Sequence, residues 1–278
     1  TGALARRVII EGNRAAGIEY EQRGERLTVR ANREVILAGG SINSPQLLML
    51  SGIGPADHLR AIGIEAAIDL PGVGANLQDH LTIYNYFECT KPVTIHRIAN
   101  PVNKLVAGVR WIVARDGLAA SNIWEAGGLI FGNANVPYPN LQYHFAPIVA
   151  EFEGRRIKLS QAFSIMVDQL RPRSRGYLRL RTANPMDAPA VRFNYLADEF
   201  DLRELIEGVR AVRELVSQPA FDEFRGRQLA PGPEATSDSD IAAWIRANTS
   251  SDFHPSCTCR MGNDGQAVVD EEMKVHGI

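Results

Sequence analysis

The stretch Phe253-His254-Pro255-Ser256-Cys257-Thr258-Cys259-Arg260-Met261-Gly262 places an imidazole, two thiols, a proline and a glycine close together. It shows neither the period of a helix nor the alternation of a strand. Proline restricts His254 to extended backbone, so the pattern predicts a loop or a strand end. Histidine exchanges protons near neutral pH, which makes His254 a candidate catalytic base. A structural histidine is the alternative.

The size and composition of the chain limit the classes of protein to which it can belong. The chain has 278 residues and 45% hydrophobic content, enough for one large core or two smaller domains. Its net charge of -2 argues against a nucleic-acid partner, which would need a basic stripe. No apolar run reaches the length of a membrane span. Residues 1–10 resemble the middle of a domain, and they show no signal segment.

The three cysteines are Cys89, Cys257 and Cys259. An odd and low count does not indicate a disulfide scaffold, and it suits a reducing compartment. Cys257 and Cys259 have no second cysteine pair and no clustered histidines, so they make a poor zinc site. We therefore expect no metal, and we expect both thiols to be buried and unreactive.

The first forty residues predict short strands at 7–12, 17–21 and 27–30, with a turn at 12–14. The run from Glu34 to Gly40 is apolar and ends in small residues. It predicts a buried strand whose end allows another group to approach the backbone closely.

The next stretch, from Gly40 to Gly54, predicts a helix. Ser44 is expected to be the N-cap, Pro45 the first helical residue and Gly52 the stop signal. A strand, a glycine turn and a helix N-terminus can hold an anionic or polar cofactor against free N–H groups. An ordinary strand-turn-helix unit is the alternative.

A short helix is expected at 55–63, followed by a loop from Gly72 to His80. This loop contains several polar side chains that can form a network near a cofactor. They can equally stabilise a turn, because such side chains hydrogen-bond the local backbone. The residues concerned are Asn76, Gln78, Asp79 and His80.

From about residue 81 the pattern changes to strands that follow one another. Grouped strands indicate an antiparallel sheet with helices on one face. The helix at 199–217 carries a stripe of apolar residues that predicts core packing. Strands are expected at 81–88, 124–131, 140–146, 162–168, 175–181 and 189–193, and further helices at 102–115 and 238–248. Trp124 is expected to point away from the sheet face that carries Glu125.

The motif His254-Pro255-x-x-Thr258-Cys259-Arg260-Met261-Gly262 resembles the C-terminal motif of the glucose-methanol-choline (GMC) flavoprotein oxidoreductases. The stretch from Gly40 to Gly54 is similar to the second signature of that family, and the likeness extends along the whole chain. Ser256 and Cys257 resemble the residues at these motif positions in the choline dehydrogenase branch of the family. The resemblance implies that His254 is the active-site base facing the flavin.

The implied fold is mixed, α+β and α/β, with part of an FAD-binding domain and an antiparallel-sheet substrate domain. The expected domains are 1–80 (partial FAD-binding), 81–235 (substrate-binding) and 236–278 (return to the FAD-binding domain, truncated). Family members begin with a GxGxxG unit that this sequence lacks. They also continue past the position of Ile278 to a second active-site Asn or His. We therefore expect an internal fragment, inactive as given.

The resemblance implies FAD as the cofactor, with Gly39, Gly40, Ser44, Asn76 and Asp79 beside it. The implied reaction oxidises a primary alcohol, most directly choline to betaine aldehyde. His254 would take the hydroxyl proton, and a hydride would pass to flavin N5. A cationic substrate needs a carboxylate and an aromatic face, for which Glu125 and Phe253 are the candidates.

Three alternatives remain open: the same chemistry on an aliphatic or other small alcohol, a lyase of the same family, and an inactive fragment. The electron acceptor is not indicated. No nucleic-acid partner and no transmembrane segment are expected. The expected location is cytoplasmic, with peripheral attachment to the inner membrane as an open alternative.

Overall fold

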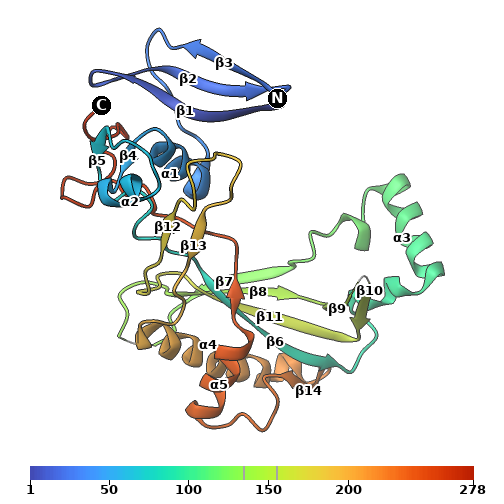
Figure 1. Ribbon diagram of the computed structural model, residues 1–278. Helices are drawn as coiled ribbons and strands as arrows, with labels where there is room; N and C mark the ends of the chain where they lie inside the picture. The colour runs from blue at the N-terminus through green and yellow to red at the C-terminus, as the bar shows by residue number, and fades with distance from the viewer. Residues whose placement is uncertain (134, 155) are drawn as a thin grey trace. The chain divides into compact units, whose positions relative to one another are not determined.

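The computed structural model describes residues 1–133, 135–154 and 156–278, and the chain forms two compact units (Figure 1). Unit 1 contains 1–79, 174–197 and 253–278, and unit 2 contains 80–173 and 198–252. The mixed fold with antiparallel sheets agrees with the expected fold class. Residues 174–197 lie in unit 1, although the expected division put them in the substrate domain. The helix at 238–248 lies in unit 2 and was expected after the return to the first domain.

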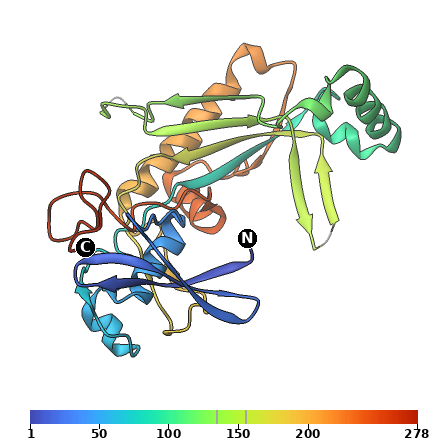
Figure 2. The ribbon, with the colours of Figure 1, turned by 90° about the horizontal axis from the view of Figure 1, so that it is seen from above.

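Unit 1 begins with a three-stranded antiparallel sheet (Figure 2). Its strands are β1 (Ala3–Glu11), β2 (Arg14–Gln22) and β3 (Glu25–Arg30). Glu11 pairs with Arg14, so Gly12 and Asn13 form a two-residue hairpin turn. Gly12 has a φ of +59°, a conformation that glycine adopts without strain. The three predicted strands and the turn are confirmed.

The buried strand predicted from Glu34 to Gly40 is wrong. Residues 34–38 belong to no sheet in the described parts of the chain, and the Ile36 side chain is 76% exposed. An apolar run becomes a strand only when a neighbouring strand supplies the ladder hydrogen bonds. Leu37 alone of this run packs against the core of unit 1.

Helix α1 (Gly40–Leu50) begins four residues before the predicted N-cap. Gly39 is the N-cap, and the Ser44 hydroxyl accepts a hydrogen bond from the Gly39 N–H at 3.0 Å. The predicted cap and start are therefore wrong, because Ser44 lies within the helix and bonds back to its first turn. Gly52, with a φ of +82°, follows the helix as predicted.

Pro45 lies inside α1 and removes one helical hydrogen bond. The carbonyl that loses its N–H partner is that of Ser41, four residues earlier. The Thr258 hydroxyl donates to this carbonyl oxygen at 2.6 Å. A side chain from the C-terminal segment thus replaces the missing backbone donor of a half-buried carbonyl.

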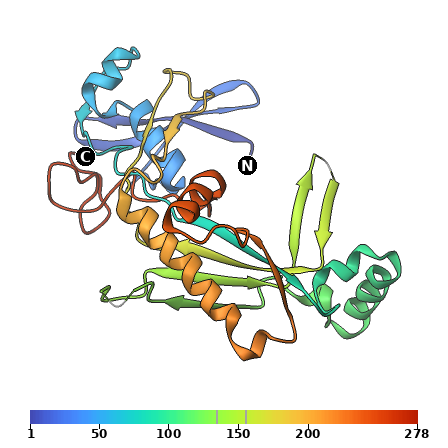
Figure 3. The same cartoon turned by 90° about the horizontal axis from the view of Figure 1, so that it is seen from below.

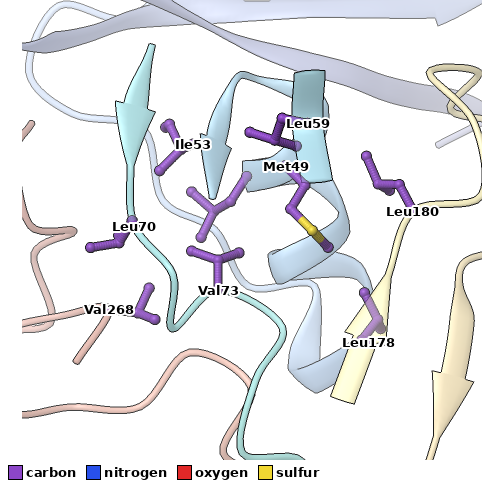
Figure 4. Close-up of a cluster of buried hydrophobic side chains, with 9 residues drawn as sticks. Met49, Ile53, Leu59, Leu70, Val73, Leu178, Leu180 and Val268 are labelled. Atoms are coloured by element: carbon purple, nitrogen blue, oxygen red, sulfur yellow. The ribbon is translucent and has the colours of Figure 1, made fainter. Parts of the chain in front are cut away.

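The core of unit 1 joins segments that are distant in the sequence (Figure 4). It involves α1, α2 (Ala56–Ala61) and β4 (Ile53–Gly54), which pairs in parallel with β5 (Ile68–Asp69). Each fully buried aliphatic side chain contributes about 1.5–3 kcal/mol. The cluster consists of Leu48, Met49, Ile53, Leu59, Leu70, Val73, Leu178, Leu180 and Val268.

Leu178 shows why residues 174–197 belong to unit 1. It lies in β12 (Tyr177–Arg179), which pairs with β13 (Ala190–Arg192) as a separate two-stranded sheet. The two strands were expected in the large sheet of the second domain, and that expectation is wrong. The ladder partner of β12 is β13. The Leu178 N–H also donates to the Gly74 carbonyl, and the Leu178 side chain enters the core of unit 1.

Unit 2 is built on an antiparallel sheet with strand order β14-β6-β11-β8-β7, and a short strand, β15, pairs with the first residues of β6. A separate hairpin pairs β9 with β10. The bounds are β6 (Leu81–Cys89), β7 (Ala126–Ile130), β8 (Leu141–Ala146), β9 (Val149–Glu153), β10 (Arg156–Ser160), β11 (Ala162–Gln169), β14 (Arg225–Ala230) and β15 (Ser250–Ser251).

Helices α4 (Glu199–Ser217) and α5 (Asp238–Asn248) match their predicted bounds. Figure 3 shows α4 lying along the sheet of unit 2. A Cβ on Gly208 would lie only 2.8 Å from a methyl carbon of Val167, so the helix approaches the sheet closely. Its predicted core stripe is confirmed, because Leu202, Leu205, Ile206, Val209, Val212 and Val216 are buried.

Buried polar groups also hold α4 to the strands. Glu204 accepts hydrogen bonds from the side-chain amides of Gln169 and Asn140, both at 2.6 Å. Burial raises the pKa of Glu204, and these two hydrogen bonds act in the opposite direction. The carboxylate is thus satisfied within the interior, as a buried polar group must be.

Helix α3 (Pro101–Ala114) forms as predicted, with Asn100 as its N-cap. Its apolar side is exposed rather than packed, and none of its residues is buried. We call this surface the α3 stripe: Val102, Leu105, Val106, Val109 and Ile112, which are 52–68% exposed. In the parts of the chain that the structure describes, short 3-10 helices also lie at Ile95–Ala99, Leu118–Ala120 and Pro219–Phe221. No helix in the described residues is long and apolar enough to cross a membrane.

Candidate active site

The segment with His254 is joined to the loop at 72–79 by backbone hydrogen bonds. Ser256 donates to the carbonyl of Gln78 at 2.8 Å, and Gln78 donates back at 3.1 Å. Gly74 donates to the Thr258 carbonyl at 2.8 Å. His254 lies on an irregular segment shortly after β15 ends, which confirms the predicted loop position.

Asp79 fixes this segment next to the imidazole. Its carboxylate is nearly fully buried and accepts a hydrogen bond from the His254 backbone N–H at 2.9 Å. The second oxygen accepts from the Tyr195 hydroxyl at 2.5 Å. A buried carboxylate with two such donors is well compensated for its lost hydration. Asp79 therefore sets the backbone position of His254, whose side chain is exposed.

The rest of the loop at 72–79 is shaped by backbone requirements. Asn76 has a φ of +58°, the left-handed conformation that asparagine tolerates. A Cβ on Gly72 would lie 2.2 Å from the Gln266 carbonyl oxygen, and one on Gly74 would lie 2.4 Å from that of Leu178. The two glycines let the loop pack against both neighbouring segments. For Asn76 these contacts favour the turn-stabilising alternative, and a cofactor contact stays a prediction.

Gly39 and Gly40 lie at the exposed start of α1. Gly40 has a φ of +73°, and a Cβ there would meet nothing within 4 Å. No side chain caps this helix start, and its first turn carries no acidic residue. The first N–H groups of a helix lack partners within it, so they can hold a polar or anionic group. This part of unit 1 therefore fits the polar part of a cofactor such as FAD.

Phe253 and Cys257 both have left-handed backbone, with φ of +61° and +71°. This conformation costs energy in a residue with a side chain, and it concentrates at functional sites. Phe253 is 87% exposed. Cys257 is also exposed, so its predicted burial is wrong. Cys259 is half-buried, and burial raises the pKa of its thiol to about 11.

Glu125 belongs to unit 2 and lies directly before β7. Its N–H donates to the Phe145 carbonyl at 3.0 Å, and its carboxylate accepts a hydrogen bond from the Ser121 hydroxyl. The side chain is exposed. The structure thus brings Asp79 and His254 together in unit 1, and it holds Glu125 in unit 2.

Sequence reasoning missed a titratable pair on the sheet of unit 2. His144 in β8 lies with its Nε2 atom 3.0 Å from an Asp168 carboxylate oxygen in β11. The Trp124 ring and the imidazole pack in a T-shaped arrangement, with the ring centroids 5.6 Å apart. Trp124 and Glu125 both precede β7, and the expectation that their side chains point to opposite faces of the sheet stays a prediction.

The sequence signal for this pair was weak. Both residues are polar positions inside otherwise apolar strands, which suggests a site, but only the strand register brings them together.

Comparison with known families matches the N-terminal GMC oxidoreductase domain to residues 1–82 and the C-terminal GMC oxidoreductase domain to residues 172–278. These two regions contain the loop at 72–79 and the segment with His254. The fold and the site thus have the features of one flavoprotein class. The chain belongs to the GMC oxidoreductase family.

Among curated relatives, a protein named oxygen-dependent choline dehydrogenase from Burkholderia cenocepacia (strain HI2424) is 45% identical over all 278 residues. The corresponding protein of Burkholderia multivorans (strain ATCC 17616 / 249) is 44% identical over the same length. In both cases the match covers 49% of the relative. The chain therefore spans about half the length of the relatives it matches.

Solved structures show the same fold. Pyridoxine 4-oxidase from Mesorbium loti matches with a TM-score of 0.83 and 28% identity, over 100% of this chain and 50% of that one. Formate oxidase from Aspergillus oryzae RIB40, as its R554K variant, matches with a TM-score of 0.90 and 24% identity. This second match covers 99% of this chain and 54% of that one, and it supports the fold alone.

Proposed function

We propose that this chain forms part of an FAD-dependent oxidoreductase that oxidises a small primary alcohol, with choline as the leading candidate. The family match supports the reaction class. Relatives named choline dehydrogenase are 44–45% identical along the whole chain, which supports the substrate. Because the chain spans about half of their length, the activity is proposed for a longer protein that contains this sequence.

The observation that carries the proposal is the anchoring of His254 by Asp79. A general base must be held within hydrogen-bond reach of the proton that it removes. The bond from the His254 N–H to the buried Asp79 carboxylate fixes the backbone beneath an exposed imidazole. We assign His254 as the group that accepts the proton from the hydroxyl of the alcohol.

FAD, when bound, would supply the hydride acceptor. The residues proposed to lie beside it are Gly39, Gly40, Ser44, Asn76 and Asp79. Gly39 and Gly40 leave the start of α1 open to a polar group, and Ser44 holds this turn in shape through its bond from Gly39. Asp79 is satisfied by protein donors, so it acts on the site through the His254 backbone.

A cationic alcohol such as choline requires a carboxylate and an aromatic face. Glu125 supplies an exposed carboxylate held by Ser121, and Phe253 supplies an exposed ring in a strained backbone conformation. We propose these two residues as substrate contacts. A neutral aliphatic alcohol would gain no electrostatic attraction from the Glu125 carboxylate. A comparison of turnover on choline and on butanol therefore separates these two substrate classes.

The electron acceptor and the location belong to the same proposal. Oxygen serves as the acceptor if the name of the Burkholderia relatives applies here. We keep a cytoplasmic location, with attachment to the inner membrane as the alternative.

His254→Ala in the longer protein tests the proposed base. Loss of a positioned base lowers the rate by about 10² to 10⁴, or about 3 to 5 kcal/mol in barrier height. Flavin content should be unchanged, because the α1 turn is untouched. The parent rate should rise with pH as the imidazole loses its proton and then level off, whereas the variant should lack this rise. Anaerobic stopped-flow measurement of flavin reduction gives both results.

His96→Ala is the matched control, because this histidine lies in the 3-10 helix at Ile95–Ala99 of unit 2. A His254→Ala protein that reduces its flavin at the parent rate would remove His254 from the mechanism. Bleaching of the flavin by the alcohol also excludes the two remaining alternatives, a lyase and an inactive protein.

A further inference from the structure

Helix α3 turns an apolar surface away from the rest of unit 2. It packs against the 3-10 helices at Ile95–Ala99 and Leu118–Ala120, and Figure 1 shows it beyond the end of the sheet. The α3 stripe lies on the outer side of the helix, and Val113, which is 80% exposed, lies beside it. The half-buried Ala107 and Gly108 lie on the inner side. A contiguous exposed apolar surface of this kind marks an interaction site.

Hydrogen bonds at both ends of α3 hold the helix that presents this surface. Asn100 caps the N-terminus by accepting a hydrogen bond from an N–H of the first turn at 2.9 Å. The Asn103 side chain donates to the Arg97 carbonyl at 3.1 Å, which ties the first turn to the preceding 3-10 helix. Near the other end, the Arg110 side chain donates twice to the Asp116 carboxylate, at 2.5 and 3.0 Å. The apolar side therefore belongs to a well-formed helix and not to a frayed segment.

The charges around the α3 stripe are almost all positive. Residues 91–116 contain five Lys and Arg residues and one acidic residue, Asp116, whereas the whole chain has a net charge of -2. Asp116 is paired with Arg110, so the other basic side chains set the charge of this surface. Helices α4 and α5 differ, because both carry acidic residues in their first turns. The basic residues concerned are Lys91, Arg97, Lys104, Arg110 and Arg115.

The basic side chains flank the stripe and do not interrupt it. Successive residues of a helix are about 100° apart, so Arg110 projects on one side of the stripe and Lys104 on the other. Long basic side chains can lay their methylene stems along an apolar surface while their charged ends reach polar headgroups. A helix with this pattern lies at the boundary between the headgroups and the acyl chains of a bilayer.

We propose that α3 docks the protein onto an anionic phospholipid bilayer, with the α3 stripe at the acyl boundary and the flanking basic residues against the headgroups. The apolar stripe drives insertion, and the positive charge selects anionic over neutral lipid. The inference does not depend on the proposed reaction. It concerns a surface helix of unit 2 that carries none of the residues proposed to contact FAD or the alcohol.

Vesicle sedimentation of the longer protein tests the proposal. Vesicles of phosphatidylcholine with about 30% phosphatidylglycerol should bind it at least about tenfold more tightly than vesicles of phosphatidylcholine alone, because each basic residue near an anionic surface contributes about fivefold. The difference should shrink in about 1 M salt, where charges are screened beyond about 3 Å. Equal binding to the two kinds of vesicle, or binding to neither, would overturn the proposal.

Lys104→Gln separates the charge of the helix from its apolar contact. Glutamine has a helix propensity close to that of lysine, so α3 should form as before. The variant should bind the anionic vesicles about fivefold more weakly than the parent. Arg246→Gln is the matched control, because Arg246 is an exposed basic residue in α5 of the same unit, and it should bind as the parent does. Equal losses in the two variants would assign the effect to net charge and exclude a specific role of α3.

Leu105→Gln with Val109→Gln tests the stripe itself. Both side chains are exposed, so the fold should be kept, whereas binding to the anionic vesicles should fall by at least about tenfold. Leu215→Gln removes an exposed apolar side chain from α4 and should leave this binding unchanged.

Flavin reduction by the alcohol should equal that of the parent in all of these variants, which separates this inference from the proposed function. Unchanged lipid binding of the double variant would overturn the proposal. Loss of self-association in ultracentrifugation without loss of lipid binding would also overturn it, because a second copy of the protein would then be the partner of the stripe.

Discussion

The proposed base is positioned through its main chain at the residue scale. Asp79 binds the His254 N–H and the Tyr195 hydroxyl, and the neighbouring Phe253 and Cys257 have left-handed backbone. Of the five residues from Phe253 to Cys257, three thus depend on the contacts that hold the segment. Such a conformation persists only where the surroundings impose it. The surrounding contacts therefore fix the backbone conformation of the motif. Its two thiols differ in exposure, because Cys257 is exposed and Cys259 is half-buried.

Cys257 and Cys259 should react at different rates. At pH 8 a small alkylating reagent should modify the exposed Cys257 at least about ten times faster than Cys259, because only thiolates react and burial disfavours the Cys259 thiolate. Mass spectrometry of timed samples measures both rates. Cys257→Ser should remove the fast reaction, and equal rates in the parent would contradict the expectation.

Burial of the Cys259 thiol also predicts that the stability of the protein depends on pH. The native pKa of Cys259 is about 11, above its ordinary value of 9.0, so the native state favours the protonated thiol. Its contribution to stability is complete below pH 9 and is lost as pH rises toward 11. Denaturant unfolding of the parent and Cys259→Ala across this range should show a smaller loss in the variant.

At the scale of elements, the helices differ in how they are stabilised. Helix α4 packs so closely on the sheet that Gly208 has no room for a side chain, whereas Gly108 in α3 has no neighbour within 4 Å of a Cβ position. The same substitution should therefore have opposite effects in the two helices.

Gly208→Ala should destabilise the protein by about 1–3 kcal/mol, because overpacking against Val167 outweighs the gain in helix propensity. Gly108→Ala should stabilise it by about 0.5–1 kcal/mol, because the helix gains propensity without a clash. Urea unfolding of both variants measures the two values. A stabilised Gly208→Ala protein would mean that α4 can move away from the sheet.

The elements also show what sequence reasoning can reach. The bounds of α4 and α5 were predicted because an apolar period and its caps are local signals. The start of α1 was missed, because Ser44 and Pro45 resemble a cap while Thr258 stabilises an earlier start. The pair of His144 and Asp168 was missed because it exists only through the register of β8 with β11.

The whole molecule consists of two units built from interrupted segments. Residues 174–197 were misplaced by sequence reasoning, because their strands give no sign of which sheet they join. The motif with His254 was located correctly on a loop, since its proline and glycine punctuate the chain. The roles of Glu125, Phe253 and the glycines of α1 stay predictions, because they depend on bound molecules.

The α3 stripe is an exposed apolar surface at this scale, and such surfaces promote association. Leu105→Gln with Val109→Gln in the 278-residue chain should lower both self-association and the binding of a hydrophobic dye. Ala107→Gln, on the other side of the helix, should change neither. Analytical ultracentrifugation gives the first quantity and fluorescence the second. Unchanged association of the double variant would show that the α3 stripe does not mediate it.

The hydrogen bond from Thr258 to the Ser41 carbonyl couples the substitutions that evolution can accept at positions 45 and 258. With proline at 45, loss of the Thr258 hydroxyl leaves a carbonyl without a donor. With any other residue at 45, the backbone N–H can serve that carbonyl, and Thr258 becomes replaceable. A lineage can therefore exchange Thr258 at low cost only after it has lost Pro45, which fixes the order of two substitutions.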